Sequence, residues 1–118
     1  MAIYVDDARI HWRGGQWCHM LADSLEELHM FARLLGVHRR WFHRTASYPH
    51  YDITVEMRDR AIDQGALLSD KATIILCARV LKTELIAQSL REIKFRNRSA
   101  LNLSNRQSDL FRSQEVVA

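Results

Sequence analysis

The sequence predicts a small α/β domain, with an α+β arrangement as the alternative. Three observations favour this class: short apolar, β-rich segments near the start, a capped amphipathic segment over 24–35, and a long helical pattern beginning at Ser69. We expect a sheet of about three to five short strands packed by two or three helices. The expected regions are a core domain over 1–68, a long helix over 69–96 that packs on the core or at an oligomer interface, and a flexible, polar and basic tail over 97–118.

The composition is that of one globular domain. The 118 residues are 47% hydrophobic and 26% charged, and a chain of this length can bury enough surface to fold without a metal or a disulfide. Two cysteines and the absence of a signal-peptide pattern predict a cytoplasmic location, in a bacterium or a phage-infected host cell. The longest apolar run, 72–78, is too short for a membrane span, and a net charge of +3 permits an anionic partner without requiring one.

The first expected strand covers 2–5 and ends at an acidic pair. Gly14 and Gly15 then predict either a hairpin or a long loop before a second strand over 17–22. The remaining expected elements are, in order, a strand over 37–43, a loop over 44–49, an extended segment over 50–53, a helix over 55–64 and a brief strand over 66–68.

Capping residues set the expected helix boundaries. Ser24 and Glu27 form a capping box at the start of the helix over 24–35, and Gly36 provides the left-handed residue that ends it. Thr54 can cap the helix over 55–64, and Ser69 with Asp70 open the long helical pattern, which we expect to reach Phe95.

Several short motifs resemble a small family of bacterial and phage proteins, the domain of unknown function 4031. The motifs are Tyr4-Val5-Asp6-Asp7, Cys18-His19-Met20, Ala22-Asp23, Glu26-Glu27-Leu28-His29, Trp41-Phe42, His50-Tyr51-Asp52, and Arg60 through Gly65-Ala66. The resemblance covers roughly residues 2–68, so the chain from Ser69 onward is expected to be an addition. It implies a short α/β domain, often phage-borne, whose motif is dominated by His, Asp and Arg, and it implies no established activity.

Two groups of polar residues are candidates for a metal site. Asp6 and Asp7 end a buried strand, where α/β folds place ligand groups, although an acidic turn explains them equally well. His50 and Asp52 share one side of an extended segment, so both can face one ion or one water. Imidazole and carboxylate suit a divalent metal or a general base, whereas the alternative is that Asp52 caps the following helix.

These residues support a first hypothesis, a phosphate-binding domain that hydrolyses a nucleotide or nucleic acid with a divalent metal such as Mg²⁺, Mn²⁺ or Zn²⁺. The metal ligands would be Asp6, Asp7 and Asp52. His50 or His19 would act as the base, and Arg60 would stabilise the phosphoryl charge. This hypothesis requires the side chains to converge in one pocket.

A second group of residues is expected to contact the ligand: Arg39, Trp41, Tyr51 and Arg58. The segment 38–44 interleaves cations with aromatic residues, as in proteins that stack bases and neutralise phosphates, although a half-buried strand with extended arginines has the same pattern. Arg58 and Arg60 can hold a phosphate near a helix start, or they can pair with Glu56 or Asp63 on the helix surface.

The alternative function is a non-enzymatic, phage-type accessory protein that binds and regulates a host protein or a nucleic acid. The carriers would be the segment 39–44, the long helix and the basic tail. The apolar stripe of the long helix also favours a homodimer. A membrane partner is not expected.

Overall fold

The computed structural model describes the backbone of residues 2–117 and the side chains of residues 2–102. Contacts between residues divide the chain into two units, Met1–Leu85 and Ile86–Ala118. The first unit contains every strand of the described chain, the helices α1 (Leu25–Leu35) and α2 (Val55–Asp63), and the first turns of α3 (Lys71–Val117). The second unit is the remainder of α3.

One mixed sheet organises the first unit. Its strands follow the order β4-β5-β3-β1-β6, and β2 pairs with the beginning of β3. All neighbours are antiparallel except β1 and β6, which are parallel. The strands are β1 (Ile3–Val5), β2 (Ile10–Trp12), β3 (Gly15–Ala22), β4 (Phe42–His43), β5 (His50–Thr54) and β6 (Leu67–Leu68). The fold is therefore α+β, with six short strands in the sheet.

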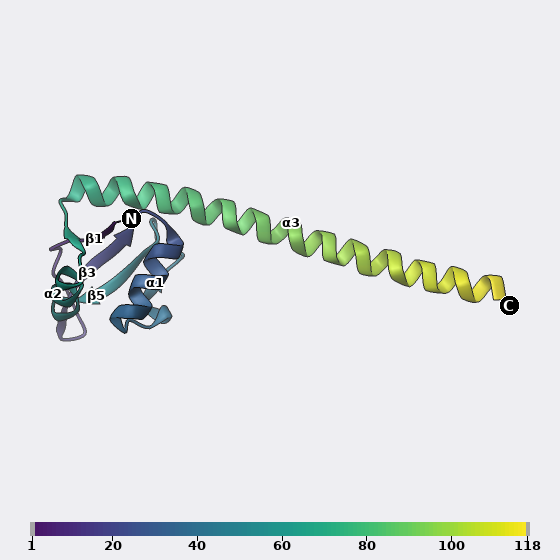
Figure 1. The fold of residues 1–118 in the computed structure, drawn as a ribbon, viewed down its shortest axis with the longest axis horizontal. Helices are drawn as coiled ribbons and strands as arrows, with labels where there is room; N and C mark the ends of the chain where they lie inside the picture. Colours follow the sequence, from purple (N-terminus) through teal and green to yellow (C-terminus); the bar gives the residue numbers. More distant parts are fainter. Residues whose placement is uncertain (1, 118) are drawn as a thin grey trace. The chain divides into compact units, whose positions relative to one another are not determined.

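Strand alternation gives the sheet two different faces. Cys18 and Met20 of β3 are completely buried in the hydrophobic core with residues of α1 and α2. His19 and Leu21 point to the opposite face, where they line a cavity together with Ile74 of α3. Figure 1 shows α1 and α2 on one side of the sheet and the first turns of α3 along the other side. The His19 side chain of β3 therefore faces α3.

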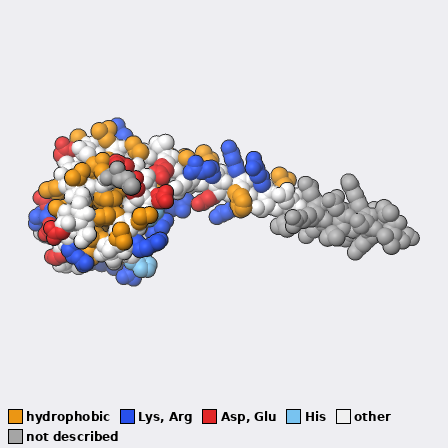
Figure 2. Space-filling model, viewed as in Figure 1, with side chains coloured by type: hydrophobic (Ala, Val, Ile, Leu, Met, Phe, Trp, Pro, Cys, Tyr) orange, Lys and Arg blue, Asp and Glu red, His pale blue; other side chains and the backbone are white. Residues whose placement is uncertain are grey.

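The α1 helix forms as its capping residues predict. The Ser24 side chain accepts a hydrogen bond from the Glu27 amide at 3.2 Å, and Gly36 ends the helix with a φ of 86°. The α1 side chains that face the core recur every three or four residues: Leu25, Leu28, Ala32 and Leu35. Apolar side chains also reach the surface of the first unit, as Figure 2 shows for one face.

The strand expected over 37–43 is largely wrong. Residues Arg39–Trp41 form a 3₁₀ turn, and only Phe42–His43 pair with β5. The cause is local, because the His38 ring accepts a hydrogen bond from the Arg40 amide at 3.0 Å. A side chain that bonds the backbone two residues ahead stabilises a turn at the expense of a strand.

The other expected elements are present. The hairpin of β2 and β3 forms at Gly14, and Thr54 caps α2 by accepting from the Met57 amide at 3.2 Å. Asp70 accepts from the Thr73 amide at 2.8 Å, so it begins α3 as the sequence predicts. The backbone of α3 continues past Phe95 through the segment expected to be a tail, whose flexibility stays a prediction. Within the part of the chain that the structure describes, no helix is both long and apolar enough to cross a membrane.

The end of α1 yields a stability prediction. Replacing Gly36 by Ala places a Cβ on a residue with positive φ, but no neighbouring atom lies within 4 Å of it, so the cost is conformational alone. We expect Gly36→Ala to lower the free energy of unfolding by about 1 kcal/mol in denaturant titrations, and Gly36→Asn to cost less because Asn tolerates the left-handed region. Gly15→Ala, at ordinary φ and with only van der Waals neighbours, is the control. Equal losses at both glycines would contradict this explanation.

Candidate functional site

Sheet register brings two distant motifs together on the face that α3 covers. His19 of β3 lies directly opposite Asp52 of β5, and His50 lies on the same face of β5, two residues earlier. Opposed side chains in an antiparallel pair have Cβ atoms about 5 Å apart. Each of the three residues offers one ligand atom, and these atoms all lie within 4.8 Å of one another. They form a cluster of two imidazoles and one carboxylate.

Asp6, at the end of β1, holds His19 in place. Its carboxylate accepts from the His19 ring Nδ1 at 2.7 Å and from the His19 backbone amide at 2.8 Å. The hydrogen bond with Asp6 raises the pKa of the His19 ring. Burial opposes ionisation of Asp6, but its hydrogen bonds with His19 outweigh burial and lower the pKa of the carboxyl. This bond at Nδ1 leaves Nε2 of His19 as the nitrogen that can bind another group.

The His50 ring is oriented by the backbone. Its Nδ1 donates to the carbonyl oxygen of Tyr48 at 2.8 Å, so the single N–H of a neutral ring is already used. The other nitrogen, Nε2, lies 3.1 Å from Oδ1 of Asp52. Two acceptors face each other at this distance unless the ring carries a second proton or a cation lies beside both atoms.

Asp52 also contacts a third histidine. Its Oδ2 lies 2.7 Å from Nε2 of His43, an exposed residue of β4 whose ring stacks on His50 with centroids 5.2 Å apart. Burial would raise the pKa of Asp52, but the hydrogen bond with His50 and the charges of the three surrounding histidines lower it. Asp52 is therefore ionised at neutral pH and is the acceptor at the centre of the cluster.

Two cavities meet at the His19 ring and at Ile74 and Ile75 of α3. The first has a volume of about 320 Å³ and extends past His50 to the loop that precedes β5. The second, of about 530 Å³, extends past Asp6 to Lys71. Both lie between the sheet and the first turns of α3, so a ligand at the cluster would lie between an apolar helix wall and a polar strand face.

The donor set favours particular metals. Two imidazoles and one carboxylate, with open positions, suit Zn²⁺, Mn²⁺ or Fe²⁺ better than Mg²⁺, which prefers oxygen ligands. Of the three carboxylates expected to bind the metal, the structure places only Asp52 in the cluster. Asp6 contacts Nδ1 of His19 and is not part of the cluster. Asp7 is exposed and forms ion pairs with Arg9 and Arg58. The hydrogen bonds with Arg9 and then Arg58 lower the pKa of Asp7.

The two arginines of α2 have different environments. Arg58 is buried, and its guanidinium pairs with Asp7 and with Asp59, the latter at 2.9 Å. It therefore ties α2 to the end of β1, in place of the expected pairing with Glu56 or Asp63. Arg60 is exposed on α2, and the structure does not bring it to the cluster.

The remaining expected ligand contacts are divided between two places. Arg39 and Tyr51 line a separate cavity of about 290 Å³ with His29, on the α1 side of the sheet. Tyr51 is buried, and its hydroxyl lies 2.9 Å from Nδ1 of His29. Trp41 instead contacts Trp12 and Trp17. A ligand at the His19 cluster is therefore not expected to contact Arg39 or Tyr51.

Sequence reasoning missed two residues of the site, His43 and Lys71. The sequence signal for His43 is the short loop 44–49, which contains Pro49. This loop joins His43 to His50 in an antiparallel pair. Lys71 had no sequence signal, since its place on the cavity wall depends on where α3 crosses the sheet.

The half-buried His29 ring makes stability depend on pH. Burial, with a smaller contribution from Arg39, lowers the pKa of His29 from 6.5 to about 4. Between these pH values the unfolded chain binds the proton and the folded chain does not, so this residue makes stability rise with pH. We expect His29→Gln to reduce that rise in denaturant titrations, whereas His11→Gln, at an exposed histidine, leaves it unchanged. An NMR titration that gives His29 its ordinary pKa would contradict the prediction.

Comparison with known protein families gives a match over residues 3–81. The match spans all six strands, α1, α2 and the first turns of α3. It extends beyond the resemblance over residues 2–68, so the α3 residues that wall the two cavities belong to the matched domain and are not an addition. No curated protein and no solved structure matches the chain. The chain belongs to the family described as protein of unknown function, DUF4031.

Proposed function

We propose that this protein binds a divalent metal ion through His19, His50 and Asp52 and hydrolyses a phosphoester bond of a nucleotide or nucleic acid. The observation that carries the proposal is the contact of His50 Nε2 with Asp52 Oδ1, 3.1 Å apart, while His50 Nδ1 is used by the Tyr48 carbonyl. A cation bound by both atoms removes the repulsion between two acceptors without a second proton on the ring.

The surroundings of the two histidines support metal binding. Histidine ligands of metals usually donate a hydrogen bond from the N–H of their second ring nitrogen to a carboxylate or a carbonyl oxygen, which fixes the ring and its tautomer. His19 has such a partner in Asp6 and His50 has one in the Tyr48 carbonyl. Both rings are therefore held with Nε2 available before any ion binds, which reduces the ordering cost of binding.

The two cavities provide room for a substrate beside the ion. A divalent ion at the cluster would polarise a phosphoryl oxygen and lower the pKa of a water molecule that it binds. Lys71 lies on the cavity wall that also contains Asp6 and His19, so we assign it the phosphoryl contact that the sequence suggested for Arg60. Ile74 and Ile75 exclude bulk water from one side and strengthen these charge interactions.

We assign proton transfer to His43. It is the most exposed histidine of the group, with 44% of its side chain accessible, and Asp52 accepts from its Nε2. A carboxylate that orients an imidazole and stabilises its protonated form is the usual support for a histidine acid or base. His19 and His50 then act as metal ligands instead of the base suggested by sequence.

Metal binding is the first test. We expect calorimetric titration of the purified protein with Zn²⁺ or Mn²⁺ to show one site, and His50→Ala or Asp52→Asn to abolish it. His11→Ala removes an exposed histidine outside the cluster and is the matched control. Binding that survives in both cluster variants, or that is equally weakened by the control, would overturn the proposed ligands. Hydrolysis of bis(p-nitrophenyl) phosphate should follow the same pattern.

A second prediction concerns Asp6, which positions His19. Loss of an outer partner of a metal-bound histidine typically weakens metal affinity about 10- to 100-fold. We therefore expect Asp6→Asn to bind the same metal about 10- to 100-fold more weakly with one site retained. Asp7→Asn, at the neighbouring carboxylate outside the cluster, should leave the affinity unchanged. The reverse order of effects would show that Asp7 is the residue that matters.

A further inference from the structure

The three tryptophans of the chain contact one another. Trp17 and Trp41 have ring centroids 5.0 Å apart, Trp12 and Trp17 are 5.8 Å apart, and Trp12 and Trp41 are 6.5 Å apart. They come from β2, β3 and the turn before β4, so tertiary structure assembles them. We call Trp12, Trp17 and Trp41 the tryptophan platform.

The platform borders the candidate metal cluster. Trp17 lies on the same face of β3 as His19, two residues away, and is paired in register with Thr54, two residues beyond Asp52. Trp41 lies two residues before His43, which contacts Asp52. A single nucleic-acid strand bound on the platform can therefore reach the cluster within about one or two nucleotides.

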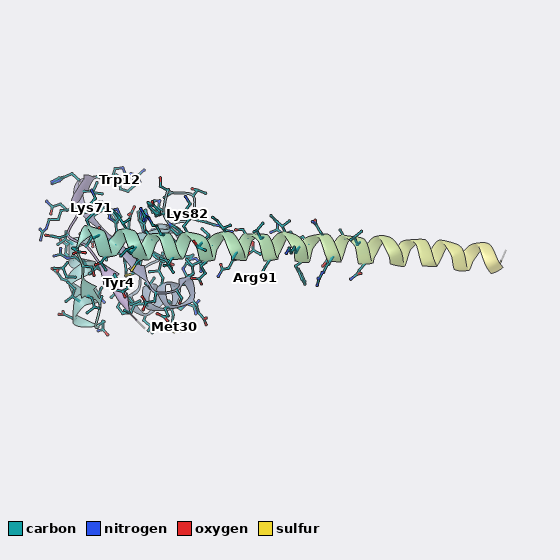
Figure 3. The ribbon with its side chains drawn as sticks, turned by 90° about the horizontal axis from the view of Figure 1, so that it is seen from above. Tyr4, Trp12, Met30, Lys71, Lys82 and Arg91 are labelled. Atoms are coloured by element: carbon teal, nitrogen blue, oxygen red, sulfur yellow. The ribbon has the colours of Figure 1, made fainter. Side chains whose placement is uncertain are left out.

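Trp12 of the platform is exposed, Trp17 and Trp41 are half-buried, and arginines lie beside them. Trp12 is 47% exposed, and in the view of Figure 3 it lies on the side of the first unit opposite Met30. The guanidinium of Arg13 lies 4.4 Å from the Trp12 ring centroid, and that of Arg40 lies 5.5 Å from the Trp41 centroid. The two segments that carry the tryptophans, 8–17 and 38–44, contain five arginines and no Asp or Glu.

Core packing does not account for this arrangement. The hydrophobic core on the α1 and α2 side is composed of other residues, and of the three tryptophans only Trp41 packs against it. The Trp17 indole donates to the Trp12 carbonyl at 3.0 Å, which stabilises the hairpin but leaves the Trp12 ring exposed. Exposed indoles with adjacent arginines are the combination that stacks bases and contacts the intervening phosphates.

We infer that the tryptophan platform binds single-stranded nucleic acid. A base stacks on the exposed indole of Trp12, Arg13 and Arg40 contact backbone phosphates, and the nucleic-acid strand continues to the His19 cluster. The last step rests on the proposed function, whereas binding to the platform does not. Duplex is excluded as the preferred ligand because its base faces are already stacked on one another.

Tryptophan fluorescence tests the inference directly, since all emission from the indoles of this chain comes from the platform. The experiment titrates full-length protein in EDTA with oligo(dT) of about 12 nucleotides, oligo(U) of the same length, the matching duplex and dTMP. We expect saturable quenching by the single strands and much weaker binding of the duplex. The ratio of the oligo(dT) and oligo(U) affinities identifies DNA or RNA as the preferred strand. Equal affinity for duplex, or no quenching, would overturn the inference.

Variants locate the binding surface. Stacking on one aromatic side chain accounts for about a 5- to 150-fold difference in affinity, so Trp12→Ala should weaken binding by that factor and Trp12→Phe should restore most of it. Arg13→Ala and Arg40→Ala keep all three indoles, and each should reduce the steepness of the salt dependence by about 0.7 in a plot of log K against log salt. Arg33→Ala, an exposed arginine of α1, is the control. Binding by Arg13→Ala and Arg40→Ala with unchanged affinity and salt dependence would overturn the assignment.

The two proposals fail separately. Oligonucleotide binding is measured in EDTA, and metal binding is measured without oligonucleotide. Quenching without a metal site would support the platform and overturn the hydrolase. A metal site that His50→Ala removes, without quenching, would support the metal centre and overturn the platform.

Discussion

The antiparallel register of β3 and β5 is the constraint on which the site depends. It places His19 opposite Asp52 and leaves His50 on the same face. A shift of one residue would turn His19 toward the core and a completely buried residue, Cys18 or Met20, toward α3. Because the opposite face must bury those apolar side chains, the hydrophobic core itself selects the register that assembles the cluster. Folding and site formation are therefore one event in this sheet.

Buried and half-buried charges tie the strand ends to that register. Asp6 accepts two hydrogen bonds from His19 and so joins the end of β1 to β3, while Arg58 joins α2 to Asp7. Each carboxylate that is taken up in this way is removed from direct ligation. The cluster therefore has two imidazoles and one carboxylate, in place of the three carboxylates that the sequence suggested. This donor set is the reason that the proposed metal is Zn²⁺, Mn²⁺ or Fe²⁺.

Local signals were sufficient for much of the fold. Capping residues and Gly36 predicted α1 and the start of α3, because each acts on backbone groups within a few residues. Gly14 and Gly15 left a hairpin and a long loop both open, and the structure has the hairpin. Period-two alternation likewise placed His50 and Asp52 on one side of a strand. The segment 37–43 failed for the same local reason, since the pattern of aromatic and basic residues concealed a turn that the His38 ring stabilises.

The sequence by itself determined the residue types of the site and the fact that His50 and Asp52 share one side of the chain, because both depend on spacing along a few residues. Only the tertiary structure decided which groups face an ion, which orient a histidine and which neutralise an arginine. Asp6 and Asp7 are adjacent in sequence, yet one supports His19 and the other pairs with Arg58. Both residues follow the end of β1, and their partners are set by β3 and by α2, which lie far away in the sequence. The contact of Trp12 with Trp41 likewise joins segments that lie far apart in the sequence, so no local pattern predicted it.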